Sequence, residues 1–386
     1  MRYCTRCILP DTRPGLTIDD DGVCSACRGH EDKEHHIDWA ARKKVFEGLV
    51  ADAKERSSGY DCIVPVSGGK DSWYQIIKAQ EYGLNVLAVT WRTPARTEIG
   101  QQNLDNMISS LGVDHIDYTI NPDVERRFMN AAFEKLGATG LPMHMALFAI
   151  PIRFALQLRI PLIVWGENAQ LEYGGAQDER LATNLDREWL AKHGCLQSTN
   201  AADWVGAEGL TEAELAAYSL GDTGVAGEEF KLESVFLGSF FKWNSFENAR
   251  IAAEHGFESN AGHLKTGTWD FADIDCRFIS LHHFLKWYKF GITRSFDNLS
   301  VQIRMGMTTR EEAIEIIREK GWEAPYEDIK AFCAFQGMPE EWFWQVCESF
   351  RNPAIWRREA DVWKIPGFLI EDWAWLNSQP ICASPS

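Results

Sequence analysis

The chain has 386 residues, of which 39 are Lys or Arg and 56 are Asp or Glu, so its formal net charge is −17. This acidity argues against a large nucleic-acid partner, because nucleic-acid binding draws its affinity from basic side chains that neutralise phosphates. The chain has no run of about 18 apolar residues and no apolar signal segment, which predicts a cytoplasmic protein that does not span a membrane.

Two Cys-x-x-Cys pairs stand near the N-terminus, Cys4 with Cys7 and Cys24 with Cys27. In a reducing compartment, paired cysteines serve as metal ligands more often than as disulfides. The spacing between the pairs is that of a four-thiolate zinc site, which is closed to further ligands and therefore structural. An iron–sulfur cluster is the alternative, because thiolates bind both. The other six cysteines are expected to be buried thiols.

The pattern along the chain predicts four parts. Residues 1–30 form a zinc-binding module, and 31–58 a linker helix with apolar positions at helical spacing. Residues 59–200 form an ATP-binding α/β domain, and 201–386 a helical, Trp-rich region for substrate or partner. The run HEDKEHH at 30–36 is interpreted as a solvated helix start rather than a metal cluster.

Strands and helices alternate between about residues 61 and 166. A buried strand over 61–66 leads into a glycine-containing loop and then a helix that ends near Gly83. The pattern continues with strands over 84–91, 114–120 and 160–166, and with helices over 98–112, 123–137 and 146–158. This alternation predicts an α/β fold with a doubly wound parallel sheet. Beyond about residue 175 we expect helices and no further strands.

The loop Ser67-Gly68-Gly69-Lys70-Asp71-Ser72 has the features of a phosphate site. The glycines let backbone N–H groups converge on an anion at the start of a helix. Lys70 adds a positive charge, the serines add hydroxyl donors, and Asp71 is a candidate ligand for Mg²⁺. The spacing fits neither a Walker A loop nor a dinucleotide-binding loop. A purely structural strand-to-helix turn is the alternative.

This strand and loop resemble the PP-loop of the ATP pyrophosphatases of the adenine nucleotide alpha hydrolase-like superfamily, over roughly residues 58–175. The resemblance implies that ATP places its β- and γ-phosphates in the loop. AMP is then transferred to an oxygen of the substrate, pyrophosphate leaves, and a nucleophile displaces AMP.

Further segments narrow the resemblance. Glu167 and Asn168 follow the predicted strand over 160–166, where ligands bind in doubly wound sheets. Lys289, Arg294 and Arg304 stand in a later stretch that begins KFGITRSFDN. Together with the cysteine pairs, these segments resemble the N-acetyl sugar amidotransferases of bacterial surface polysaccharide synthesis. That group includes the O-antigen and the pseudaminic or legionaminic acid enzymes, and the resemblance extends over nearly the whole chain.

The closer resemblance implies an ATP-dependent conversion of an acetamido group on a nucleotide-linked sugar into an acetamidino group. It also implies that ammonia comes from a separate glutaminase, similar to that of imidazole glycerol phosphate synthase, alongside a cyclase-like subunit in some systems. The chain agrees, because it has neither an N-terminal glutaminase cysteine nor a visible nucleophile-elbow cysteine.

The resemblance assigns catalytic roles to Ser67, Lys70, Asp71 and Glu167, with Glu167 or Asn168 contacting the adenylated substrate or a metal. Lys289, Arg294 and Arg304 are expected to contact phosphate or carboxylate groups of the substrate. A surface ion pair is the alternative for Arg304, and a cap of a helix or loop is the alternative for Glu167. Three histidines, His144, His282 and His283, are left as core residues.

Two rival functions stay open. A tRNA-thiolating enzyme of the same superfamily would have a basic face and a catalytic cysteine near the ATP site. A noncatalytic zinc-ribbon scaffold would not need the intact loop with its lysine, aspartate and two serines.

Overall fold

The computed structural model describes residues 1–175, 182–185, 187–194, 196–220, 230–262, 266–359 and 362–370. Its helices are α1 Ser25–His35, α2 Trp39–Arg56, α3 Lys70–Glu81, α4 Glu98–Leu111, α5 Pro122–Leu136, α6 Leu141–Leu158, α7 Ala169–Tyr173, α9 Arg187–His193, α10 Glu212–Leu215, α11 Ser245–His255, α12 Ile279–Phe290, α13 Arg294–Arg304, α14 Arg310–Lys320, α15 Tyr326–Gln336 and α16 Glu340–Ser349. Its strands are β1 Cys62–Pro65, β2 Val86–Trp91, β3 Asp114–Tyr118, β4 Leu162–Trp165, β5 Glu233–Phe236, β6 Arg357–Glu359 and β7 Val362–Lys364.

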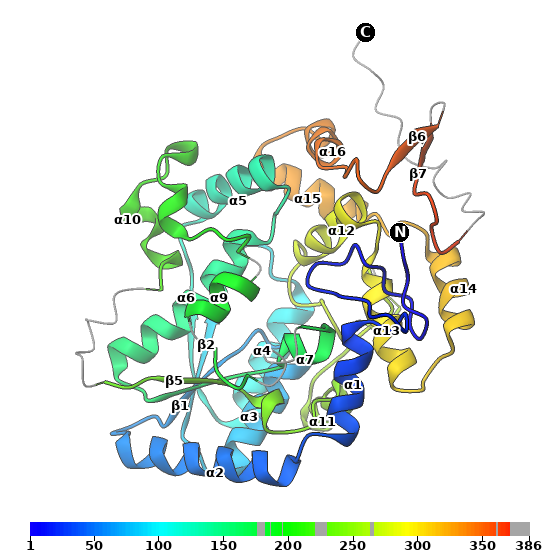
Figure 1. The fold of residues 1–386 in the computed structure, drawn as a ribbon. Helices are drawn as coiled ribbons and strands as arrows, with labels where there is room; N and C mark the ends of the chain where they lie inside the picture. Colours follow the sequence, from blue (N-terminus) through cyan, green and yellow to red (C-terminus); the bar gives the residue numbers. More distant parts are fainter. Residues whose placement is uncertain are drawn as a thin grey trace.

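Five parallel strands form the central sheet, in the order β3-β2-β1-β4-β5. Figure 1 labels β1, β2 and β5 of this sheet. The predicted α/β class and parallel sheet are therefore confirmed. The first four strands fall within the predicted ranges, because each is a short apolar or alternating run bounded by turns. The expectation of no strand beyond residue 175 is wrong: β5 completes the sheet, and β6 and β7 form an antiparallel pair.

The two faces of the sheet are covered by different helices. Cys62 and Val64 of β1 pack into a cluster with side chains of α2, α3, α4 and α11. Ile63, which points the opposite way, belongs to the larger core that includes α5, α6 and the C-terminal helices. This alternation is the period-two geometry of a strand, and burial on both faces explains its continuous apolar sequence.

Helix α6 lies in that larger core. Among the described residues, it is the one helix long and apolar enough to cross a membrane, with a mean hydropathy of 1.4, but 56% of it is buried in the protein. It packs against β1, β2 and β4. A core helix of this length and composition meets the same criterion, so α6 is weak evidence for a membrane span.

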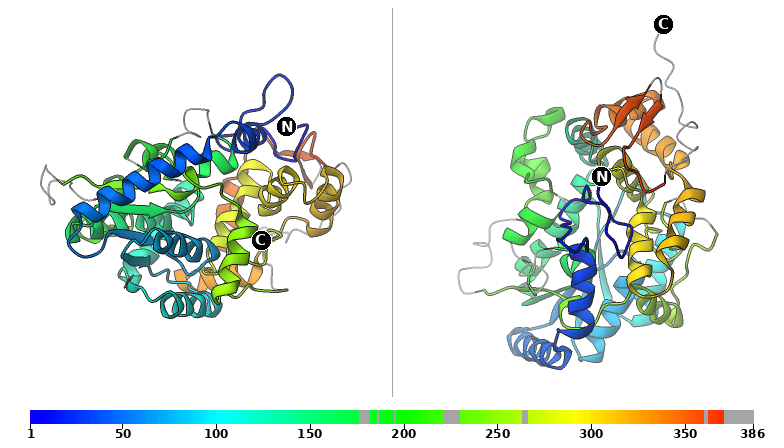
Figure 2. Two further views of the ribbon diagram at one scale, coloured as in Figure 1. Left: turned by 90° about the horizontal axis from the view of Figure 1, so that it is seen from below. Right: turned by 45° about the vertical axis from the view of Figure 1, so that its right-hand side comes forward.

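The N-terminal segment lies beside α13 and α14, as both views in Figure 2 show. The segment between the cysteine pairs is loop with isolated bridges, and α1 then begins at Ser25. The run at 30–36 is therefore not a solvated helix start. It includes the last turns of α1, where Lys33 is buried and pairs with Glu172 of α7 at 2.8 Å. The expected linker helix follows as α2.

Candidate functional site

The glycine-containing loop lies where the strand order of the sheet reverses. The chain builds outward from β1 to β2 and β3, and then returns to place β4 on the other side of β1. The loop Ser67–Ser72 follows β1, and Gly166, Glu167 and Asn168 follow β4. The carboxyl ends of the strands at this point are the usual ligand site of a doubly wound sheet. We refer to the region between the Ser67–Ser72 loop and residues 166–168 as the crevice.

Internal hydrogen bonds shape the loop. The Ser67 N–H donates to Ser72 Oγ at 3.0 Å, and the Gly69 N–H donates to Ser67 Oγ at 3.3 Å. Gly68 has a φ of +89°, and a Cβ there would lie 2.8 Å from the Leu104 nitrogen. Glycine is therefore required at position 68 by both conformation and space. No side chain caps α3 at Gly69, so the positive end of the helix faces the loop.

Lys70 and Asp71 begin α3 and contact each other. Lys70 Nζ donates to Asp71 Oδ2 at 2.5 Å and lies 5.7 Å from the centre of the Phe271 ring. Asn248 of α11 donates from Nδ2 to the other Asp71 oxygen at 3.2 Å. Lys70 is buried, whereas the Asp71 side chain is 35% exposed. A carboxylate with this access suits Mg²⁺, which commonly binds to one or two carboxylates and to substrate phosphates.

A distant segment covers the loop. Residues 273–277 run along the start of α4, where the Thr97 N–H donates to the Asp275 carbonyl at 3.1 Å. The Asp275 carboxylate accepts a hydrogen bond from the Ser67 side chain, and burial raises its pKa. Sequence reasoning missed Asp275, Asp273 and Asn248. The run DFADID at 270–275 was the available signal for the two aspartates, since it places three carboxylates within six residues.

Glu167 lies just after β4, and the charges of Asp71 and Lys70 in the loop act on its carboxyl group. Burial, together with the nearby Asp71 carboxylate, raises the pKa of Glu167 to about 7. Its Oε2 accepts a hydrogen bond from the Tyr173 hydroxyl at 3.3 Å. Glu167 caps no helix, since Asn168 does so for α7. A partly buried carboxyl with a pKa near neutrality is a candidate proton acceptor.

Arg294 belongs to a buried charge network beside this crevice. Its Nε donates to Asp273 Oδ2 at 2.9 Å, and its charge also acts on Glu167. Asp273 has a positive φ of 58°, and its Oδ1 lies 3.4 Å from His283 Nε2. The structure thus brings together the loop, Glu167 and Arg294. His283, expected to be an inert core residue, belongs to the same network.

The other predicted residues are placed differently. Asn168 Oδ1 accepts from the Gln170 and Leu171 N–H groups, and its Nδ2 donates to Ser239 Oγ at 3.1 Å, so this side chain holds the turn after β4. Lys289 donates to the Leu136 carbonyl at 2.5 Å and contacts the Phe350 ring rather than the crevice. Arg304 Nη2 donates to the Glu172 carbonyl at 3.0 Å.

The four N-terminal cysteines converge on one point. Their sulfur atoms all lie within 4.8 Å of one another, and none is in a disulfide. Cys7 Sγ lies 3.6 Å from Cys24 Sγ, and Cys4 Sγ lies 3.9 Å from Cys27 Sγ. Sulfurs bound to one Zn²⁺ at about 2.3 Å in a tetrahedron would be about 3.8 Å apart. The cysteines could therefore hold a metal such as zinc.

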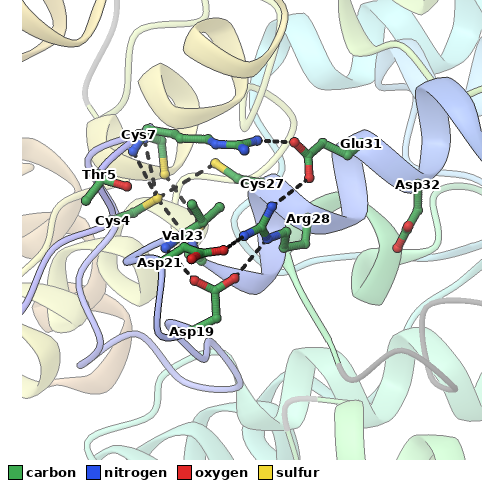
Figure 3. Close-up of polar contacts among 12 residues, drawn as sticks. Cys4, Thr5, Cys7, Asp19, Asp21, Val23, Cys27, Arg28, Glu31 and Asp32 are labelled. Atoms are coloured by element: carbon green, nitrogen blue, oxygen red, sulfur yellow. Dashed lines mark hydrogen bonds and ion pairs between the residues drawn. The ribbon is translucent and has the colours of Figure 1, made fainter.

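Backbone donors support this site. Cys4 Sγ accepts from the N–H groups of Arg6, Cys7 and Cys24 at 3.3–3.5 Å, as Figure 3 shows in part. Hydrogen bonds from the neighbouring thiols, with that of Cys24 the largest, hold the pKa of Cys4 well below its usual range. Beside the cysteines, Arg28 ion-pairs with Asp19 at 2.8 Å and with Glu31 at 3.2 Å (Figure 3). A metal here would fix a loop that has little apolar core of its own.

The cysteine module contacts the elements around the crevice. Arg13 donates to Asp297 of α13 at 2.8 Å and to the Tyr173 carbonyl at 3.2 Å. Arg310 of α14 donates to the Cys7 carbonyl at 3.2 Å. Gly174 packs so closely on α1 that a Cβ would lie 2.6 Å from the Ala26 nitrogen. The module therefore connects α7 to α13 and α14.

Comparison with known families gives one match. Residues 266–368 match the family model described as "LPS biosynthesis protein WbpG-like, C-terminal domain". This match supports an assignment to a lipopolysaccharide biosynthesis family and suggests an enzyme. The matched segment includes Asp273, Asp275 and Arg294, which lie at the crevice. A comparison with curated proteins gave no match.

Proposed function

We propose that this protein is an ATP-dependent N-acetyl sugar amidotransferase of the PP-loop type. It adenylates the acetamido oxygen of a nucleotide-linked sugar and replaces that oxygen with ammonia, giving an acetamidino sugar, AMP and pyrophosphate. The pathway is the synthesis of lipopolysaccharide O-antigen or a related surface glycan. The proposal rests on the position of the Ser67–Ser72 loop at the point where the strand order reverses. Residues 273–277, which belong to the segment matched by the lipopolysaccharide family model, pack beside this loop.

The first step is adenylation. The acetamido oxygen attacks the α-phosphorus of ATP, the bond to the bridging oxygen breaks, and pyrophosphate leaves. The loop N–H groups, Lys70 and the start of α3 offer positive charge to the departing phosphates. Asp71 would hold Mg²⁺, which neutralises phosphate charge when bound.

The second step is displacement by ammonia. Nitrogen attacks the imidate carbon, the carbon–oxygen bond breaks, and AMP leaves with the former acetamido oxygen. The attacking nitrogen must lose a proton, and Glu167 is suited to accept it because its pKa is about 7. Ammonia is proposed to come from a separate glutaminase, with a cyclase-like subunit as a further partner.

One experiment tests the proposal directly. Purified protein is incubated with ATP, Mg²⁺, ammonium and a panel of UDP- and CMP-linked N-acetyl sugars. We expect release of AMP and pyrophosphate with at least one sugar, and a product whose mass reflects exchange of oxygen for NH. The absence of sugar-dependent AMP release, with release on addition of unmodified tRNA, would favour the thiolation function instead.

Cys276 is relevant to that rival. It follows Asp275, whose carboxylate accepts a hydrogen bond from the Ser67 side chain. Burial raises the pKa of Cys276 to about 12, and its sulfur contacts Thr93 Oγ1 at 2.9 Å. A thiol so protonated is a poor nucleophile, which argues against thiolation through this residue.

A further inference from the structure

A cavity lies near the end of β4, beside Glu172 and Trp243. It has a volume of about 350 Å³ and is enclosed by α1, α7, α13 and the turn before α11. This volume is in the range of small-molecule sites. Its charged lining includes His30, Lys33, Glu172, Lys242 and Arg304. We refer to it as the Arg304 cavity.

One nitrogen of the Arg304 guanidinium group has no hydrogen-bond partner among the described residues. Its Nη2 bonds the Glu172 carbonyl, but its buried Nη1 has no hydrogen-bond partner among the described residues. A buried guanidinium N–H without a partner is costly unless a ligand or water satisfies it. The missing partner is therefore expected to be an acceptor, and an anion is the strongest acceptor for Arg.

The other charges of the cavity are largely paired. Lys33 bonds Glu172 at 2.8 Å, and Lys242 bonds Glu34 at 2.5 Å. Glu247, which also lines the cavity, bonds Arg250 at 2.6 Å. Arg304 is thus the lining cation whose charge is not balanced by a carboxylate contact among the described ion pairs. The formal charges of the lining sum to zero, so the positive charge without a carboxylate contact is confined to Arg304.

Two further features agree with an anion site. Burial is the main cause that lowers the pKa of His30 to about 4, and the nearby charges of Lys33 and Arg304 lower it further, so a positive potential acts on this ring. Helix α11 begins at the cavity with Asn244 and Ser245, so its positive end adds to that potential.

The Arg304 cavity adjoins the crevice through shared residues. Trp243 lines the cavity and packs against the end of β4, where a Cβ on Gly166 would lie 3.4 Å from its ring. Glu172 lines the cavity and precedes Tyr173, whose hydroxyl bonds Glu167. On α11, Glu247 lines the cavity and its neighbour Asn248 bonds Asp71. A ligand anchored in the cavity would have its other end close to the loop.

We propose that the Arg304 cavity binds the phosphate groups of the acceptor, a nucleoside-phosphate-linked sugar, with the Arg304 guanidinium as the main anchor. This inference rests on the proposed function, and it places the acceptor's phosphates in a site separate from the loop that takes the phosphates of ATP. The acetamido group would then extend past Trp243 toward Asp71 and Glu167.

The test measures binding of UDP and of CMP by calorimetry. The full-length protein is first saturated with Mg²⁺ and a nonhydrolysable ATP analogue, so that the Ser67–Ser72 loop is already occupied. Arg304→Ala should weaken the Kd of the nucleotide by about 10- to 100-fold, because it removes a charged donor. The Kd of Arg304→Lys should lie between those of the wild type and Arg304→Ala, because Lys keeps the charge but lacks the planar guanidinium group. The affinity for the ATP analogue should not change.

Two further variants complete the design. Arg318→Ala is the matched control, because Arg318 is a half-exposed arginine on α14 that pairs only with Glu315 among the described ion pairs. Its Kd should equal that of the wild type. Lys242→Ala is a second probe that should leave the fold intact, because that side chain is 48% exposed. It should also weaken binding, since Glu34 is left unpaired in the cavity.

The outcomes separate this inference from the proposed function. Nucleotide binding that is lost in Arg304→Ala, without AMP release from any sugar nucleotide, supports the site and contradicts the amidotransferase function. Turnover in which Arg304→Ala leaves the KM for the sugar nucleotide unchanged overturns the site and keeps the function. The site is also overturned if neither UDP nor CMP binds to the wild type. The same holds if the Kd values of Arg304→Ala and Lys242→Ala both equal that of the wild type.

Discussion

Arg13, in the loop between the two cysteine pairs, donates from Nε to Oδ1 of Asp297 in α13 at 2.8 Å, across 284 positions of sequence. Asp297 is almost fully buried and also bonds Lys286 at 2.9 Å. Burial alone would raise the pKa of Asp297, but Lys286, Arg13 and Arg294 together hold it well below its usual range. The cysteine module therefore supplies part of the charge that keeps a buried carboxylate ionised beside the crevice.

Arg13→Ala should destabilise the protein in a pH-dependent way. At pH 7 we expect a loss of about 1–3 kcal/mol, because Asp297 loses one of its cationic partners while staying buried. A carboxyl with a depressed pKa adds stability above its unfolded pKa and loses it as pH falls through the folded value. The difference between variant and wild type should therefore shrink in acid. Urea unfolding at several pH values measures this, and Arg126→Ala, in an exposed pair, is the control.

Metal removal should loosen the cysteine module. Metal analysis is expected to find one zinc ion per chain, and a strong chelator should lower Tm by roughly 5 °C or more, because binding of the metal is coupled to folding of the loop. Cys24→Ser should act in the same way. Cys333→Ser, a buried thiol outside the cluster, should retain the metal. A coloured protein that contains iron would instead indicate a cluster of iron and sulfur.

Two glycine substitutions should have opposite effects. Gly68→Ala places a Cβ 2.8 Å from the Leu104 nitrogen at a φ of +89°, so we expect a loss of about 2 kcal/mol or more and no ATP turnover. Gly48, inside α2, has no atom within 4 Å of an added Cβ. Gly48→Ala should stabilise the protein by about 0.5–1 kcal/mol. Thermal unfolding and AMP release measure both variants, and equal activity would contradict the role of the loop.

Glu167→Gln should lower turnover and raise the stability of the protein at high pH. Because the folded pKa of Glu167 is raised to about 7, its contribution to stability is fully present below the unfolded pKa and is lost as pH rises through about 7. The neutral amide avoids that loss. We therefore expect the variant to match the wild type at pH 5 and to exceed it by about 1–3 kcal/mol at pH 8. Turnover with ammonia should fall at all pH values.

Glu125→Gln is the matched control for this prediction. Glu125 is buried, and burial raises its pKa to about 8. It accepts a hydrogen bond from Trp91 Nε1 at 2.7 Å, and no hydrogen bond or ion pair found among the described residues joins it to the loop. The Glu125→Gln variant should be more stable than the wild type at high pH, as Glu167→Gln is, and should keep full turnover. If both variants keep full turnover, Glu167 does not act as the proton acceptor.

The sequence was sufficient for the parts of the fold that local patterns determine. The strand β1, the loop after it and α3 follow from a buried apolar run, two glycines and a helical pattern within about twenty residues. The cysteine cluster followed from spacing alone. Even so, α1 was not predicted, because its buried positions depend on contacts such as the Lys33–Glu172 pair, which joins residues 139 apart.

The parts that were missed depend on distant contacts. The run that forms β5 has only four residues and begins with the charged Glu233, so its strand identity comes from pairing with β4 rather than from its own pattern. Asp275 and Asn248 reach the crevice only because the chain returns to the loop after more than 170 residues. Arg304 lies at the adjoining cavity, and no local pattern distinguished that position from a surface ion pair.

The return of the chain at Asp275 has a consequence for biosynthesis. The Ser67–Ser72 loop is made early, but the sheet gains its last strand only at Phe236, and the loop gains its cover only after residue 277. At about 5–20 residues per second, a ribosome needs at least ten seconds to make the intervening chain. The Ser67–Ser72 loop of the nascent protein therefore stays uncovered through much of its synthesis, and under the proposed function the protein would acquire its ability to use ATP as one of the last events of folding.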